Sequence, residues 1–233
     1  MITPMITAHS GCEGTSDDSI ASVKTGIALG ADCVEVDVRT GRDGSLRLSH
    51  DEIGDKNGLT TLREAFALIR ESGIAVNCDL KEYGALLPVI DLAEECGLIS
   101  REQLIFSGCV DPKFLASHPA AAARSRIFLN SEELVSDLTG NRDLRRAEQA
   151  AFLLAHTRPA AERFRLTGAA ALNAPYGIMT DDLIGALRAE GIPLSLWTLN
   201  DEDILREYMK KDLLNITTRI PSAALRIRGA AGK

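Results

Sequence analysis

The chain has 233 residues, of which 45% are hydrophobic, so it can bury one substantial core and a single domain over residues 1–233 is expected. A net charge of -7 and a pI of about 5.2 leave no basic surface to neutralise a nucleic-acid backbone or an anionic membrane. With no signal-like start and no apolar stretch long enough to span a bilayer, the sequence favours a small-molecule substrate over nucleic-acid binding or stable membrane anchoring.

The first half of the chain alternates short apolar runs with stretches of helical periodicity. Gly30 follows the first helical stretch, and glycine is the residue type that best accepts a left-handed helix cap. Polar or glycine-bearing turns separate the runs. The expected strands are 6–8, 33–38, 46–49, 75–80 and 104–106, and the expected helices are 19–29, 62–71 and 85–96.

The second half of the chain continues the pattern after a stretch that is harder to assign. Residues 131–168 contain helical segments, and the apolar run at 152–155 fits either a helix or a strand. The other expected strands are 126–129, 169–172, 194–199 and 214–217, and the other expected helices are 181–190 and 203–210.

Repeated βα units predict a parallel sheet covered by helices. A chain of this length with this many units favours a closed (β/α)8 barrel of the TIM type, with little or no insertion subdomain, over an open doubly wound sheet. No glycine-rich dinucleotide or Walker motif argues for the open sheet. The five cysteines are an odd number without CxxC spacing, which fits reduced thiols and a cytoplasmic protein.

Carboxylates occur inside strands that otherwise consist of buried residue types. Because alternate side chains of a strand share a face, Glu35 and Asp37 should point together, and Asp79 and Lys81 repeat this spacing two apart. Buried charges are costly unless they are paired or bind a metal, and the carboxyl ends of barrel strands are where active sites form. Three acids suit one hard divalent cation, Mg²⁺ or Ca²⁺, better than tetrahedral zinc.

His9 and His50 each follow a strand-like run and precede turn residues. Imidazoles that titrate near neutral pH can take and give protons within one turnover. A lone histidine is nevertheless more often a hydrogen-bonded structural residue than a catalytic one, so neither position decides the function alone.

Several motifs occur in an order that resembles the glycerophosphodiester phosphodiesterase family, from about residue 6 to residue 221. So many motifs in one order are more specific than any single one. They are Ala8-His9-Ser10-Gly11, Ser16-Asp17-Asp18-Ser19, the run from Gly30 to Val38, Asp43-Gly44, Ser49-His50-Asp51-Glu52, Asp79-Leu80-Lys81, Trp197-Thr198-Leu199-Asn200 and Thr217-Thr218-Arg219-Ile220-Pro221.

The resemblance implies a (β/α)8 barrel enzyme that hydrolyses small glycerophosphodiesters to glycerol 3-phosphate and an alcohol. It makes His9 and His50 the acid–base pair, without saying which is the acid. It also implies that Lys81 sits over a phosphate oxygen and that Trp197 forms an apolar wall for the glycerol. The cation ligands that it implies are Glu35, Asp37 and Asp79.

The sequence departs from the family pattern at three motif positions and in one connection. Ser10 replaces an arginine, so the bidentate phosphate contact is lost, and Arg39 is the nearest arginine in sequence that could compensate. The Pro-Glu-Asn-Thr start of the first helix becomes 16–19, Ser-Asp-Asp-Ser. Asp79 stands where glutamate is usual. The connection 53–60 is short, which predicts an open mouth and loose selection of the alcohol.

Two alternatives share these residues. A substrate hydroxyl could attack the phosphorus and release a cyclic phosphate, as in related sphingomyelinase-D-like phospholipases. A barrel that binds phosphorylated ligands without turnover is suggested by Ser10 and Asp79. The presence of His9 and His50 argues against it, because a binding module needs no acid–base pair.

Overall fold

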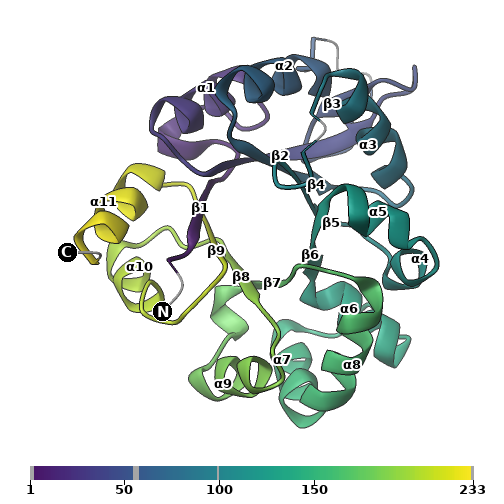
Figure 1. Ribbon diagram of the computed structural model, residues 1–233, viewed down its shortest axis with the longest axis vertical. Coiled ribbons are helices and arrows are strands. Elements are labelled where there is room, and N and C mark those ends of the chain that lie inside the picture. Colours follow the sequence, from purple (N-terminus) through teal and green to yellow (C-terminus); the bar gives the residue numbers. More distant parts are fainter. Residues whose placement is uncertain (1–2, 55–57, 99, 232–233) are drawn as a thin grey trace.

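The computed structural model describes residues 3–54, 58–98 and 100–231. Its centre is a nine-stranded sheet in which β3 (Leu46–Leu48) pairs antiparallel with β2 (Cys33–Thr40). The remaining strands are parallel, and β1 (Met5–Ala8) pairs with both β2 and β9 (Asn215–Thr218), which closes the barrel (Figure 1). The predicted (β/α)8 barrel is therefore confirmed. Its other strands are β4 (Ala75–Leu80), β5 (Leu104–Gly108), β6 (Arg126–Asn130), β7 (Ala171–Pro175) and β8 (Leu194–Trp197).

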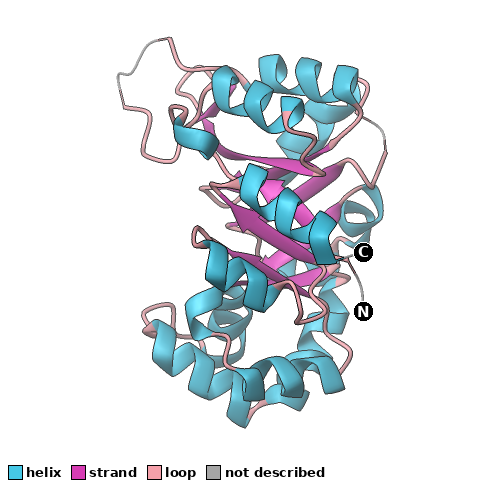
Figure 2. Cartoon of the chain, turned by 90° about the vertical axis from the view of Figure 1, so that its left-hand side faces the viewer, coloured by secondary structure: helices cyan, strands magenta, loops and turns pink. Residues whose placement is uncertain are grey.

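Helices surround the barrel on the outside, as both views show (Figures 1 and 2). Two short 3-10 helices, η1 (Cys12–Gly14) and η2 (Tyr176–Ile178), follow β1 and β7. None of the helices in the described ranges is both long enough and apolar enough to cross a bilayer. The α-helices are α1 (Ile20–Ala28), α2 (Leu62–Ser72), α3 (Leu86–Glu95), α4 (Pro112–Ser117), α5 (Pro119–Arg124), α6 (Ser131–Thr139), α7 (Arg146–Ala155), α8 (Thr157–Thr167), α9 (Asp181–Ala189), α10 (Glu202–Tyr208) and α11 (Pro221–Ala231).

The stretch that the sequence left open, 131–168, forms α6, α7 and α8, and the ambiguous run 152–155 is the end of α7. The strand expected at 169–172 begins two residues later, at Ala171. The delay follows from Gly168, which ends α8 in the left-handed conformation with φ +67°, so two residues are needed to return to the sheet.

Local sequence explains where the first helices begin. The Ser19 hydroxyl accepts a hydrogen bond from the Ser22 N–H at the start of α1, and Thr61 and Glu64 form a reciprocal capping box at the start of α2. Gly30 has φ +75° after α1, as its position predicted. In the connection 53–60, residues 55–57 lie outside the described ranges, so the predicted open mouth on that side stays a prediction.

Strand alternation separates two environments. The odd-numbered positions Cys33 and Ala75 belong to a small apolar cluster at the amino ends of the strands, inside the barrel, with Ile105, Phe128 and Ala171. The even-numbered positions of β2, Val34, Val36 and Val38, belong to the larger core between the sheet and the helices. The odd positions of β2 continue toward its carboxyl end with Glu35 and Asp37. These two side chains therefore lie inside the barrel, closer to the carboxyl ends of the strands than the small apolar cluster.

Candidate active site

A cavity of about 560 Å³ opens at the carboxyl ends of the strands, the end at which barrel active sites form. The structure brings most of the residues singled out in the sequence to its wall, although they come from positions as far apart as 9 and 197. Those that line it are His9, Glu35, Asp37, His50, Asp79, Lys81 and Trp197.

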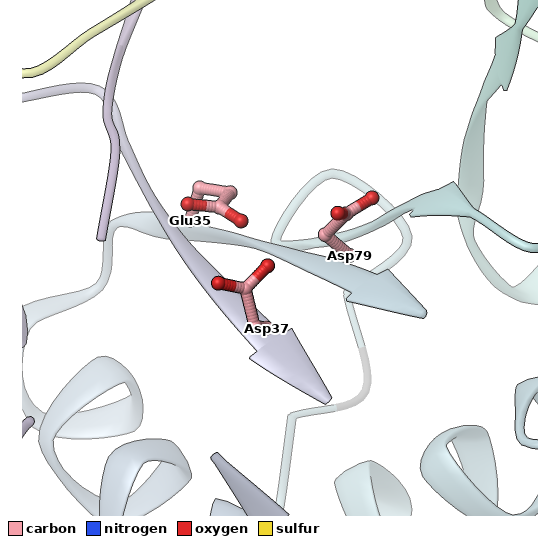
Figure 3. A group of neighbouring side chains, drawn as sticks. All are labelled: Glu35, Asp37 and Asp79. Carbon is pink, nitrogen blue, oxygen red and sulfur yellow. The ribbon is translucent and has the colours of Figure 1, made fainter. Parts of the chain in front are cut away.

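Three carboxylates converge at the floor of this cavity (Figure 3). One oxygen from each of Glu35, Asp37 and Asp79 lies within 4.8 Å of the others. The convergence follows from register, because Asp37 on β2 is directly opposite Asp79 on β4 and Glu35 is two residues back on the same face. Glu35 and Asp37 are only 6% and 3% exposed, so the cluster gathers negative charge away from water.

Burial and the neighbouring carboxylates strongly perturb the pKa of Glu35. Burial raises its pKa well above the ordinary value, and the nearby charges of Asp37 and Asp79 raise it further. The Ser10 N–H donates a hydrogen bond of 2.8 Å to Glu35 Oε2 and acts in the opposite direction. A cation beside Glu35 would stabilise its ionised form against burial and against repulsion from Asp37 and Asp79.

Lys81 is the cation that the chain itself supplies. Its Nζ lies 2.7 Å from Asp37 Oδ1 and also donates to Asp79 Oδ2. Burial opposes the charged ammonium, but the carboxylates of Asp79 and Asp37 outweigh burial and raise the pKa of Lys81. One ammonium therefore faces three carboxylates, and Glu35 has no comparable ion pair with a lysine or arginine within the described residues.

Asn77 adds a buried polar atom without a partner. It is opposite Glu35 in the sheet register and lines the cavity. Its Nδ2 donates to Ser107 Oγ at 3.0 Å, and Ser107 donates to Asp79 Oδ1 at 2.8 Å, which orients that carboxylate. Asn77 Oδ1 has no hydrogen-bond partner within the described residues. A buried oxygen of this kind needs a donor or a cation, so the donor set fits a hard divalent ion with bound water.

His9 is held in a defined tautomer on the loop after β1. Its Nδ1 lies 2.8 Å from the Ser10 carbonyl oxygen, which only accepts, so Nδ1 donates and Nε2 is left without a proton in the neutral ring. Burial lowers the pKa of His9, and the hydrogen bond to Ser10 only partly opposes this. His9 is thus a neutral imidazole with a proton-accepting nitrogen.

His50 lines the same cavity and is more open, with 68% of its side chain exposed. Its Nδ1 is 3.0 Å from Asp51 Oδ1, so this nitrogen donates to the carboxylate and Nε2 is available for other contacts. The His50 backbone is fixed on both sides: its N–H donates to Asp18 Oδ2 at 2.8 Å, and its carbonyl accepts from Arg39 Nε at 3.1 Å.

Ser10 and Arg39, the two positions considered for phosphate contact, are not among the residues that line the cavity. Ser10 is 2% exposed, and its hydroxyl accepts a hydrogen bond of 2.7 Å from the Asp18 N–H. The Arg39 Nε is used by the His50 carbonyl. Burial raises the pKa of Asp18 to about 6, although the His50 N–H lowers it.

The structure adds lining residues that sequence reasoning missed: Asn77, Arg146 and Arg219. Asn77 could have been found from alternation, since it is two residues before Asp79. Arg219 directly follows β9, within a motif already noted. Arg146 lies 5.7 Å over the Trp197 ring and comes from the segment whose structure the sequence did not define, so no local signal pointed to it.

Comparison with known proteins finds one matching family model. The model of the glycerophosphoryl diester phosphodiesterase family matches residues 9–57, the segment that supplies His9, Glu35, Asp37 and His50. The chain matches no curated protein sequence.

Solved structures share the fold over nearly the whole chain. A glycerophosphodiester phosphodiesterase from Thermotoga maritima is 20% identical with a TM-score of 0.70, covering 98% of this chain and 99% of that one. One from Parabacteroides distasonis is 16% identical with a TM-score of 0.73, covering 99% of both. An Oleispira antarctica phosphodiesterase in complex with the product sn-glycerol-3-phosphate is 18% identical, with a TM-score of 0.72 and coverage of 97% and 96%.

The matched segment and the site it builds on this barrel agree with the order of motifs along the sequence. The matched segment resembles the glycerophosphoryl diester phosphodiesterase family, and solved structures that are 20% identical or less share the barrel fold of the whole chain.

Proposed function

We propose that the protein hydrolyses glycerophosphodiesters to glycerol 3-phosphate and an alcohol with the help of one divalent cation. The observation that supports this most directly is the convergence of three carboxylates, two imidazoles and a lysine on one cavity at the carboxyl ends of the strands. The residues 1–233 act in this proposal as one catalytic domain.

Glu35, Asp37 and Asp79 would hold the cation, Mg²⁺ or Ca²⁺, because all three offer oxygen ligands and Glu35 is buried without an ion-pairing lysine or arginine in the described ranges. When bound, such a cation polarises the phosphodiester and offsets its charge. Lys81 already contacts two of these carboxylates and would place its ammonium close to a phosphate oxygen.

The two histidines would move the protons. His9 Nε2 is the proton acceptor, because its Nδ1 is occupied as a donor and burial keeps the ring neutral. It takes the proton of a water whose oxygen forms the new bond to phosphorus. His50, acting in its protonated form with Nδ1 bonded to Asp51, would give its Nε2 proton to the alkoxide that leaves as the second phosphorus–oxygen bond breaks. Trp197 would line the glycerol side of the cavity.

The direct test is turnover of purified protein on several glycerophosphodiesters with Mg²⁺, Ca²⁺ or Mn²⁺, before and after treatment with EDTA. We expect activity that is lost on chelation and returns with the metal. Activity that survives exhaustive chelation would contradict the cation assignment. Absence of turnover with every metal would favour a barrel that binds phosphorylated ligands only.

Phosphorus NMR of the products separates hydrolysis from the related cleavage in which a substrate hydroxyl attacks. Hydrolysis gives glycerol 3-phosphate from the start of the reaction. A cyclic phosphate as the first product would instead show that His9 accepts the proton of a substrate hydroxyl, with the same residues otherwise in place.

All five cysteines are free thiols, which supports a reducing compartment such as the cytoplasm as the site of action. Fractionation of the native host with an antibody to the protein tests this proposal.

A further inference from the structure

We propose that Arg219 binds the nonbridging oxygens of the phosphodiester and is the main phosphate-recognition residue that the chain supplies at the rim of the cavity. The proposal rests on the function proposed above. Arg219 lines the same cavity as the carboxylates and His9, but comes from the loop between β9 and α11.

The charges around the cavity favour Arg219 over the other cations of its wall. Lys81 is shared between Asp37 and Asp79, so much of its charge is already balanced. Arg146 stacks over Trp197 at 5.7 Å, where the ring face attracts it. Arg39 donates to a backbone carbonyl and does not line the cavity.

The backbone of Arg219 is fixed on both sides. Its N–H donates to Asn200 Oδ1 at 2.8 Å, and its carbonyl accepts from the Glu13 N–H at 2.8 Å. The guanidinium is anchored at one corner, where Nη1 lies 2.7 Å from Asp17 Oδ1. A side chain held in this way loses less freedom when it binds a ligand.

Gly11 leaves the space in which this ion pair forms. It has φ +74°, and a Cβ built on it would lie 2.1 Å from Asp17 Oδ1 and 2.6 Å from Arg219 Nη1. Any larger residue would displace one partner. The backbone turn after His9 thus brings the guanidinium beside His9, and the charge of Arg219 contributes to the lowered pKa of that histidine.

The rest of the guanidinium remains available for a ligand. Its Nε and Nη2 have no hydrogen-bond partner within the described parts of the chain, and the side chain is 40% exposed. A planar fork with free donors matches two oxygens of a phosphate. Ser10 offers no such contact, because its buried hydroxyl is hydrogen-bonded to Asp18.

The experiment compares Arg219→Gln and Arg219→Lys with Arg226→Gln. Arg226 is a matched control, since it is exposed on the neighbouring α11, pairs with a single acid, Glu202, and lies outside the cavity wall. Affinity for inorganic phosphate is measured by calorimetry in the presence of Mg²⁺, and kcat and KM are measured on sn-glycero-3-phosphocholine.

We expect Arg219→Gln to weaken phosphate binding and raise KM by about tenfold to a hundredfold, the range for losing charged hydrogen bonds, with a smaller change in kcat. Phosphate affinity and KM of Arg219→Lys should lie between those of the wild type and Arg219→Gln, because lysine keeps the charge and loses the planar guanidinium with its paired donors. Asp17→Asn, which loosens the anchor, should raise KM less. Arg226→Gln should resemble the wild type.

Phosphate affinity that is equal in the wild type and Arg219→Gln, or absent in both, would overturn the proposal. A fall in kcat with unchanged KM and phosphate affinity would also overturn it. Because phosphate binding needs no turnover, an inactive wild-type protein would refute the proposed hydrolysis while the titration still decides the role of Arg219.

Discussion

The charge of Glu35 bears directly on the stability of the fold. Its folded-state pKa lies above the ordinary value of 4.5, so the folded state holds the proton more tightly than the unfolded chain does. Below about pH 4.5 this carboxyl is protonated in both the folded and the unfolded state, so its charge does not reduce the free energy of unfolding. As the pH rises from there toward the raised pKa, stability is progressively lost.

Glu35→Gln removes this charge and keeps an oxygen to accept from Ser10. We expect the metal-free variant to melt at a higher temperature than the wild type at pH 7, by about 2–4 °C for each kcal/mol relieved. The difference should disappear near pH 4. Added Mg²⁺ should raise the melting temperature of the wild type by binding the folded state, and should have little effect on the variant. A lower melting temperature for the metal-free variant at pH 7 would contradict this account of the cluster.

His9 and His50 should each be needed for turnover. We expect His9→Ala and His50→Ala to lower kcat by about two to four orders of magnitude, the range for losing a positioned acid or base. Circular dichroism should show folded protein in both cases, because neither side chain belongs to the apolar core. A near-normal rate in either variant would remove that histidine from the mechanism.

The loop between η1 and α1 joins the two histidine segments through one side chain, Asp18. It accepts from the His50 N–H and contacts the Ser10 hydroxyl, and it has φ +53°. We expect Asp18→Ala to lower kcat by about tenfold, because loss of a hydrogen bond to a charged group frees the His50 loop. Asp18→Asn should retain most activity, since asparagine keeps an acceptor and tolerates a positive φ. Equal kcat values in the two variants would show that the contact does not position His50.

Among the elements, the strands of the first half could be predicted well from sequence. In β2 and β4, buried residue types at alternate positions revealed both the strand and the face that carries the acids. The region 131–168 could not be resolved, because α7 and α8 follow one another with only His156 between them and Pro159 already lies in the first turn of α8. The short helix α5 is mostly alanine and shows no apolar periodicity.

The site was predictable where its residues follow from strand alternation and motif order. Glu35, Asp37 and Asp79 share the cavity because register aligns neighbouring strands, which alternation alone anticipates. The partners of these residues were not predictable. The contact of Arg219 with Asp17 joins opposite ends of the chain, and the contact of Asn77 with Ser107 depends on which strands are neighbours.

At the scale of the whole molecule, the barrel closes where β1 meets β9, and Asn215 bridges this seam. It accepts from the Thr7 hydroxyl at 2.7 Å and donates to Ser195 Oγ at 2.9 Å, with no exposed surface. Asn215→Ala should destabilise the fold by about 2 kcal/mol, because buried polar partners are left unsatisfied. We expect the melting temperature to fall by about 4–8 °C. A matched change at the exposed Asn141, on the surface after α6, should leave the melting temperature unchanged.

The alternation of β2 divides two tasks between neighbouring residues of one strand. Val34, Val36 and Val38 hold the barrel to its helices, whereas Glu35 and Asp37 face a space where packing is not the constraint. Selection for stability and selection for chemistry therefore act on different codons. Such a scaffold lets new activities evolve by exchange of inward residues while the outer core is retained. For the same reason, a library that randomises only the positions that line the cavity should yield mostly folded proteins with altered substrates.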